Sequence, residues 1–171
     1  WHRRPEQGHR FATADPGIGA PKSAGNISIS TNKGEHTVAF EPLRVGIMGC
    51  GTISGIYLQN SKLFDAFDIV AVADTRLNAA QARADEYGVA KAYTPEQLLA
   101  DPDVELVINL TPHHAHGPVA LSILEAGKHV YNEKPLAVYR EEAEKIFAAA
   151  EARNLLIGCA PDTFMGGAWQ T

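Results

Sequence analysis

The chain has 171 residues, of which 45 % are hydrophobic and 20 % are charged, proportions typical of a globular protein with one sizeable core. Its net charge at pH 7 is −5, and no basic stripe is present, which argues against nucleic acid as a partner. No apolar run approaches the roughly 20 residues that a membrane-spanning helix needs, so no membrane partner is expected either.

The two cysteines, Cys50 and Cys159, lie in apolar segments and do not suggest a disulfide framework. This usage fits the reducing cytoplasm, which is the location that we predict. Arg3 and Arg4 form a pair like the one in twin-arginine export signals. No apolar stretch follows them, so we reject that interpretation.

Residues 1–37 differ in composition from the rest of the chain. They are rich in Gly, Pro, Ser, Thr and Asn, show no sustained apolar period and begin with Trp1. Such a segment buries too little apolar area to offset the entropy lost on ordering, so we expect it to be mostly disordered. An alternative to a flexible tail is a translated leader. Residues 32–36 must be encoded by purine-rich codons that resemble a ribosome-binding sequence, and Val38 could be encoded by a GTG start codon.

From residue 38 to residue 160, short apolar runs alternate with helical periods. The runs are continuous and do not alternate with polar residues, which is typical of parallel strands buried on both faces. This order predicts an α/β fold, a Rossmann-like doubly wound parallel sheet with helices on both faces. The expected strands are LRVGIM (43–48), DIVAVA (68–73), ELVINL (105–110), KHVYN (128–132) and LLIGCA (155–160).

Local start and stop signals place helices between these strands. One helix ends at Gly88, and a short one starts at a capping box, Thr94 to Gln97, with proline at its first helical position. A third helix opens at residues 117–118 and closes at Gly127. The faces expected to be buried are Leu77, Ala80, Ala84 and Tyr87 in the first helix, Val119, Ile123 and Leu124 in the third, and Ala143, Ile146, Phe147 and Ala150 in the last.

The stretch VGIMGCGTISG (45–55) joins the first expected strand to a helix and has the pattern of a phosphate-binding glycine loop. Gly49 would make the tight turn, and Gly51 would let the backbone N–H groups at the helix N-terminus approach a pyrophosphate. The third glycine position holds Ser54, which is small enough for the helix to pack closely on the strand. A glycine pattern alone is weak evidence for a dinucleotide site.

The next expected strand leads into Asp74, twenty positions after Ser54. An acidic residue at this spacing would accept hydrogen bonds from the adenosine ribose of a dinucleotide. Arg76 could instead pair with a 2′-phosphate, so NAD is favoured and NADP is the alternative cofactor. The rival for such a loop is a methyltransferase that binds S-adenosylmethionine. That class normally has an acidic residue just ahead of the glycines, where this chain has Ile47 and Met48.

Two further segments, NLTPHHAH (109–116) and YNEKPLA (131–137), follow later strands. Together with VGIMGCGTISG and VAVADTR, they make the chain from about residue 43 onward resemble the Gfo/Idh/MocA oxidoreductase family. The members of this family are NAD(P)-dependent dehydrogenases of sugars, inositols and related polyols. The triplet Glu133-Lys134-Pro135 at a strand end is the most specific element of the resemblance.

The resemblance implies a cofactor site that is spread over several loops. The pyrophosphate would lie on Gly49, Gly51, Thr52 and Ile53, and the ribose on Asp74, with Arg76 beside it. Thr111, Pro112, His113 and His116 would line the nicotinamide side, and Glu133 and Lys134 would reach the nicotinamide and the substrate. Where the family commonly has asparagine after Thr-Pro, this chain has His113, so the contact made there stays open.

Lys134 is the expected catalytic residue, and its chemistry is reasonable without the resemblance. When hydride leaves a carbinol carbon, a cation beside the oxygen lowers the cost of alkoxide development. Pro135 biases Lys134 towards an extended backbone, which would help to aim its side chain. No metal site is expected, because His113, His114 and His116 have no cysteine or acidic residue close in sequence to complete one.

Residues 161–171 resemble the start of the family's crossover into a second α/β domain, which would hold the substrate and support a homo-oligomer. This chain is expected to lack that domain and the residues that usually transfer the proton. We therefore expect a parent protein that is a dehydrogenase of a sugar, inositol or similar polyol. This chain alone would bind the cofactor with little or no turnover. The alternatives are a non-catalytic dinucleotide-binding module and, less favoured, a methyltransferase domain.

Overall fold

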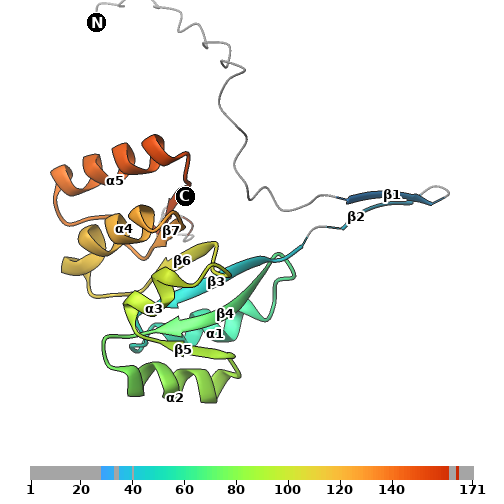
Figure 1. Cartoon of the computed structure of the whole chain (residues 1–171), viewed down its shortest axis with the longest axis horizontal. Helices are drawn as coiled ribbons and strands as arrows, with labels where there is room; N and C mark the ends of the chain where they lie inside the picture. The colour runs from blue at the N-terminus through green and yellow to red at the C-terminus, as the bar shows by residue number, and fades with distance from the viewer. Residues whose placement is uncertain (1–27, 33–34, 40, 162–164, 166–171) are drawn as a thin grey trace, which may run out of the picture.

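The computed structural model describes residues 28–32, 35–39, 41–161 and 165. Its centre is a six-stranded parallel sheet with the order β5-β4-β3-β6-β7-β8 (Figure 1). The chain adds strands outward from β3 in one direction and then continues on the other side of β3, so the fold is the doubly wound Rossmann-like fold that the sequence predicts. The strands are β3 (Leu43–Met48), β4 (Phe67–Ala73), β5 (Lys91–Tyr93), β6 (Leu106–Asn109), β7 (His129–Asn132) and β8 (Ile157–Cys159).

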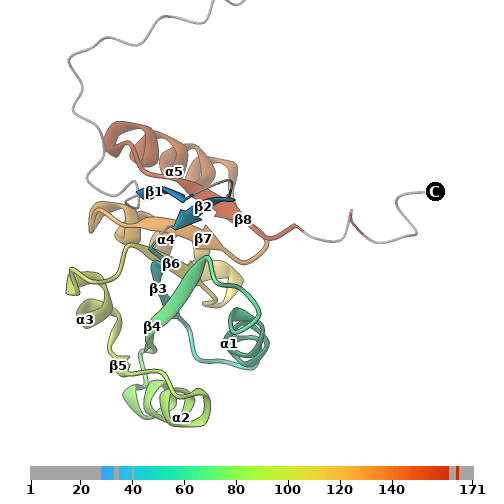
Figure 2. The same ribbon diagram turned by 90° about the vertical axis from the view of Figure 1, so that its right-hand side faces the viewer.

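Helices cover both faces of this sheet, and Figure 2 shows α1 and α3 on opposite sides of β4. One face packs against α1 (Ser54–Ser61) and α2 (Leu77–Tyr87). The other packs against α3 (Pro95–Ala100), α4 (His116–Glu125) and α5 (Arg140–Arg153), with a short 3-10 helix, η1 (His113–Ala115), ahead of α4. The central strands are therefore buried from both sides, which explains their continuous apolar runs. None of the helices in the described part of the chain is long and apolar enough to cross a membrane.

The predicted helix signals are confirmed at two boundaries. Gly88 ends α2 in the left-handed conformation, with φ +75°. Thr94 begins α3 with a complete capping box: the backbone N–H of Gln97 donates to Thr94 Oγ1, and the backbone N–H of Thr94 donates to Gln97 Oε1.

Three details of the sequence prediction are wrong. The strand β5 was not expected, because its three half-buried residues form no apolar run. Phe147 was placed on the buried face of its helix, yet its side chain is 55 % exposed, and the helix buries the narrower pair Ile146 and Ala150. Leu77 was assigned to a buried face and is also exposed, because it lies at the open first turn of α2.

Part of the N-terminal segment forms a separate two-stranded antiparallel sheet. The strands β1 (Ser28–Asn32) and β2 (Glu35–Ala39) pair from Ser28 opposite Ala39 to Asn32 opposite Glu35. This pairing differs from the disorder expected for residues 1–37, and β2 runs through Val38, where a native start was one interpretation. Residues 1–27 lie outside the described residues, so the expectation for them stays a prediction.

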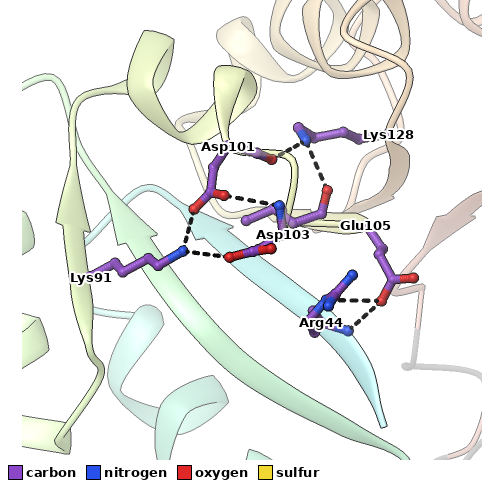
Figure 3. Close-up of polar contacts among 7 residues, drawn as sticks. Arg44, Lys91, Asp101, Asp103, Glu105 and Lys128 are labelled. Atoms are coloured by element: carbon purple, nitrogen blue, oxygen red, sulfur yellow. Dashed lines mark hydrogen bonds and ion pairs between the residues drawn. The ribbon is translucent and has the colours of Figure 1, made fainter. Parts of the chain in front are cut away.

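The amino ends of the strands are joined by a charged network (Figure 3). Lys91, the first residue of β5, donates to the carboxylates of Asp101 and Asp103, at 2.8 and 3.1 Å. Lys128 ahead of β7 is buried and donates to the backbone carbonyls of Asp101 and Val104, at 2.7 and 2.8 Å. Burial alone would raise the pKa of Asp101, but the hydrogen bonds from Lys91 and from the backbone of Asp103 hold that pKa below its ordinary value. At this end of the sheet, the contacts of Lys91 and Lys128 tie β5 and β7 to the loop that precedes β6.

Candidate functional site

A cleft of about 740 Å³ opens at the opposite edge of the sheet, where the carboxyl ends of the strands meet. It lies where the strand order reverses, between β3 and β6, which is the usual ligand site of open α/β sheets. The loops after β3, β4 and β6 line it. They bring together most of the residues that the sequence assigned to a cofactor: Gly49, Gly51, Thr52, Ile53, Asp74, Arg76, Thr111, Pro112 and His113.

The first two glycines of the loop after β3 have different reasons to be glycine. Gly49 has φ +107°, and a Cβ there would lie 2.7 Å from the backbone carbonyl of Leu110, so no side chain fits. Gly51 has no protein atom within 4 Å of the position that its Cβ would take. Because Gly51 lines the cleft, the protein leaves this space open to a ligand. A pyrophosphate at the start of α1 needs such an approach.

The third glycine position is filled by a serine that stabilises the loop. Ser54 is completely buried, and its hydroxyl donates to the backbone carbonyl of Gly51 at 2.7 Å. The glycine that follows serves helix packing, since a Cβ at Gly55 would lie 2.9 Å from the hydroxyl of Tyr87 on α2. The serine therefore preserves the close contact between helix and strand, and the displaced glycine lets α1 and α2 approach each other.

Asp74, directly after β4, is tied to the glycine loop. Its Oδ2 accepts a hydrogen bond from the backbone N–H of Cys50 at 2.9 Å, and its Oδ1 accepts one from the backbone N–H of Arg76 at 2.9 Å. Burial alone would raise the pKa of Asp74, but these two hydrogen bonds and the charge of Arg76 lower it overall. The group is thus a carboxylate at neutral pH, able to accept hydrogen bonds from ribose hydroxyls.

Arg76 is positioned to influence the same carboxylate. Its Nε lies 3.6 Å from Asp74 Oδ1, while its side chain is 73 % exposed and lines the cleft. A guanidinium that is this free can turn towards an additional anion such as a 2′-phosphate.

The loop after β6 forms the far wall of the cleft. Thr111 is held by Asn109, whose Oδ1 accepts from the Thr111 backbone N–H at 3.2 Å and from its hydroxyl at 2.7 Å. Pro112, His113 and His114 are exposed along the wall. His113, whose contact the sequence analysis left open, is therefore at the cleft surface, where it can contact a ligand.

Glu133 and Lys134 follow β7 and lie beside the first cleft, outside its lining. Glu133 lines a neighbouring cleft of about 650 Å³, which shares Ile53 with the first. Its Oε1 accepts from the hydroxyl of Tyr57 at 3.0 Å, and its Oε2 accepts from the backbone N–H of Lys134 at 2.7 Å. The side chain of Lys134 is exposed.

His116 is not at the cleft surface, where the resemblance implied it. Its side chain is fully buried at the start of α4. Asn109 and Asn132, which the sequence analysis did not single out, are buried beside it. Each asparagine is the last residue of its strand, β6 or β7, and this shared position was the available signal. The rings of His113 and His116 meet edge to face, with 5.6 Å between their centroids. Among the described residues, no group of three or more His, Cys, Asp or Glu side chains is arranged to hold a metal ion.

A family model matches residues 43–160: an oxidoreductase family with an NAD-binding Rossmann fold, Gfo/Idh/MocA. Among curated proteins, the chain is 37 % identical over 112 residues to the inositol 2-dehydrogenase of Salmonella typhimurium, covering 64 % of this chain and 33 % of the relative. It is 28 % identical over 116 residues to the myo-inositol 2-dehydrogenase of Thermotoga maritima, covering 67 % and 35 %. The chain thus spans about a third of the length of these relatives.

Solved structures of proteins in complex with NADP or NAD also match this chain over part of their length. KijD10, a 3-ketoreductase from Actinomadura kijaniata in complex with NADP and TDP-benzene, superposes with a TM-score of 0.67 at 33 % identity, covering 72 % of this chain and 38 % of KijD10. GenD2 from gentamicin A biosynthesis, in complex with NAD, superposes with a TM-score of 0.65 at 28 % identity, covering 76 % and 37 %.

Proposed function

Because the chain belongs to the Gfo/Idh/MocA oxidoreductase family with an NAD-binding Rossmann fold, we propose that its cleft binds a nicotinamide dinucleotide. The pyrophosphate would lie on the loop after β3, the adenosine ribose on Asp74, and the nicotinamide towards the loop after β6. Glu133 and Lys134 would approach the nicotinamide and the substrate from the loop after β7.

The observation that carries this proposal is the hydrogen bond between Asp74 and the backbone of Cys50. It joins the end of β4 to the glycine loop. The carboxylate that would accept from the ribose is therefore held at a set distance from the backbone that would bind the pyrophosphate. The open space beside Gly51 and the steric requirement for glycine at Gly49 fit the same ligand. S-adenosylmethionine has no pyrophosphate and would not need the open approach beside Gly51, and the buried residues ahead of the glycines, Ile47 and Met48, are apolar.

NAD is the favoured cofactor. An ionised Asp74 accepts hydrogen bonds from two ribose hydroxyls and repels a 2′-phosphate. Arg76 offsets part of that repulsion, which makes NADP the second choice.

Within a longer protein, we propose oxidation or reduction of a sugar, inositol or similar polyol. The relatives described as inositol dehydrogenases and a 3-ketoreductase support this substrate class. The bound nicotinamide supplies or accepts the hydride. The ammonium group of Lys134 would stabilise negative charge on the substrate oxygen. The carboxylate of Glu133 accepts a hydrogen bond from the backbone N–H of Lys134, which helps to fix the backbone that carries this side chain. The 171-residue chain by itself would bind cofactor with little or no turnover.

The test is a titration of NADH, NADPH and S-adenosylmethionine into the 171-residue chain, followed by nicotinamide fluorescence and, for the third ligand, by competition. We expect saturable NADH binding that weakens in Asp74→Ala. Asp68→Ala is the matched control, because Asp68 lies on the same strand at its exposed opposite end. Lack of NADH binding by a folded chain, or displacement of NADH by S-adenosylmethionine at comparable concentration, would contradict the proposal.

A further inference from the structure

Three buried polar side chains lie beneath the loops that follow β6 and β7. Asn109, His116 and Asn132 all have zero exposure, although they come from β6, α4 and β7. Asn109 and Asn132 are opposite each other in the parallel register, and Asn109 Nδ2 donates to Asn132 Oδ1 at 3.0 Å. Buried polar groups of this kind are costly unless they are satisfied, and each of the three has hydrogen-bond partners.

His116 contacts the backbone of two separate loops. Its Nε2 lies 2.8 Å from the backbone carbonyl oxygen of Thr111, and its Nδ1 lies 2.6 Å from that of Pro135. In the neutral ring one of these contacts is an N–H···O hydrogen bond, and in the protonated ring both are. The ring therefore spans the space between the cleft wall and the segment that carries Lys134.

The two asparagines each support one side of this space. The Asn109 side chain holds Thr111 through two hydrogen bonds, and Asn132 Nδ2 donates to the carbonyl of Leu136 at 2.7 Å. Of the three buried side chains, His116 alone contacts the backbone of both segments.

We propose that His116 is a positioning residue, which fixes the nicotinamide-side loop at Thr111 relative to the Glu133-Lys134-Pro135 segment. The inference rests on the proposed function for its ligand and on the buried contacts for its geometry. His116 is shielded from solvent, so it acts through the two backbone segments and through the ring of His113, which meets it edge to face with 5.6 Å between the ring centroids. Its chemical role is to hold the cation of Lys134 at a set distance from the nicotinamide end of the cleft.

The adenosine end of the cleft does not depend on this network. Gly49 donates its backbone N–H to Ala73, and Asp74 is held by the backbone of Cys50 and Arg76. Loss of His116 should therefore affect the nicotinamide half of the dinucleotide and spare the adenosine half. ADP-ribose, which lacks the nicotinamide ring, separates the two halves.

The test measures the binding of NADH and of ADP-ribose to the 171-residue chain and to His116→Phe, which keeps an aromatic ring without donors. We expect NADH affinity to fall by about tenfold, the loss of one well-made hydrogen bond, while ADP-ribose affinity changes by less than about twofold. His116→Gln retains a donor and should recover part of the NADH affinity. The matched control is His129→Phe: His129 accepts from the backbone N–H of Leu156 at the far end of β7, so its loss should not change the ratio of the two affinities.

Hydrogen–deuterium exchange gives a readout that needs no ligand. We expect faster exchange in residues 111–115 and 133–137 of the His116 variants and unchanged exchange there in His129→Phe. Equal weakening of both ligands, unchanged binding of both, or unchanged exchange in these segments would overturn the proposal. If His116→Phe does not fold, the same outcomes apply to His116→Gln. Failure of the unsubstituted chain to bind either ligand would instead contradict the proposed function, and the exchange measurement would still decide the role of His116.

Discussion

The carboxylate of Asp74 accepts a hydrogen bond from the backbone N–H of Cys50, with 2.9 Å between the two atoms. This bond links the end of β4 to the glycine loop after β3. Both segments are already ordered before a ligand binds. Binding therefore does not have to offset the conformational entropy that would be lost on ordering them.

The first concerns cofactor preference. Asp74→Asn removes the negative charge but keeps the size and one acceptor oxygen. We expect weaker NADH binding, by about tenfold, because hydrogen bonds to a charged group are lost. NADPH binding should improve relative to NADH, since Arg76 remains beside the site. The measurement is a pair of fluorescence titrations. In the double variant with Arg76→Ala the relative gain for NADPH should shrink to the part that comes from removing the Asp74 charge, and a gain of unchanged size would exclude a role for Arg76.

The second concerns Gly49. Alanine there would adopt a positive φ and overlap the Leu110 carbonyl, so Gly49→Ala should lower the free energy of unfolding by more than about 2 kcal/mol. Gly88→Ala is the matched control: it also has a positive φ, but no atom lies within 4 Å of the added Cβ. We expect it to cost about 1 kcal/mol. Urea unfolding measures both, and equal losses would show that contact with Leu110 does not matter.

The third concerns acid stability. The pKa of Asp101 is lowered in the folded chain, so its ionised form stabilises the fold above the pKa of the unfolded chain, about 4. That stabilisation is lost as the pH falls through the lower folded value. In Asp101→Asn the melting temperature should drop at pH 7, and its further decrease below about pH 4 should be shallower than in the unsubstituted chain.

Asp85→Asn serves as the control for acid stability, because Asp85 is exposed on α2. Thermal melts from pH 7 to pH 2.5 would reveal the difference. Parallel acid limbs in the Asp101 variant and the unsubstituted chain would argue against the ion pair with Lys91.

The fourth concerns thiol reactivity. Burial, together with the charge of Asp74, raises the pKa of Cys50 to about 11. At pH 8 only about one thiol in a thousand would then be ionised, so Cys50 should react with an aromatic disulfide reagent far more slowly than in the unfolded chain. Cys159, which is only partly buried, should react first. Cys50→Ala and Cys159→Ala assign the two phases, and fast modification of Cys50 in the folded chain would show that the loop opens readily.

Much of the fold could be predicted because the signals are local. The strands are continuous apolar runs, Gly88 and the Thr94 capping box mark helix ends, and the resemblance covered the part of the chain that the family model matches. The strand β5 could not be predicted, because three half-buried residues carry no periodic signal. Phe147 was placed wrongly because the helical period predicts the direction of the buried face of α5 but not its width.

The part of the candidate site that could be predicted is the part marked by residue spacing along the sequence. The spacing of Gly49, Gly51 and Asp74 in the sequence singled them out, and the fold brings them together in the lining of one cleft. Burial of His116 was not predictable, because it depends on the loops of two neighbouring strands closing over the same ring. A linear motif does not specify which of several histidines lines the cleft and which is buried behind it.

The contact of β3 with β6 joins two halves of the sheet, and the cleft takes its walls from both. Residues before β6 supply the glycine loop and Asp74, and residues after it supply the far wall. Neither half alone forms the cleft, so a bound dinucleotide would contact both halves and stabilise their pairing between β3 and β6. At a hundred times its dissociation constant, such a ligand would stabilise the assembled fold by about 2.7 kcal/mol. Occupancy of the cleft and folding of the sheet are in this way linked equilibria.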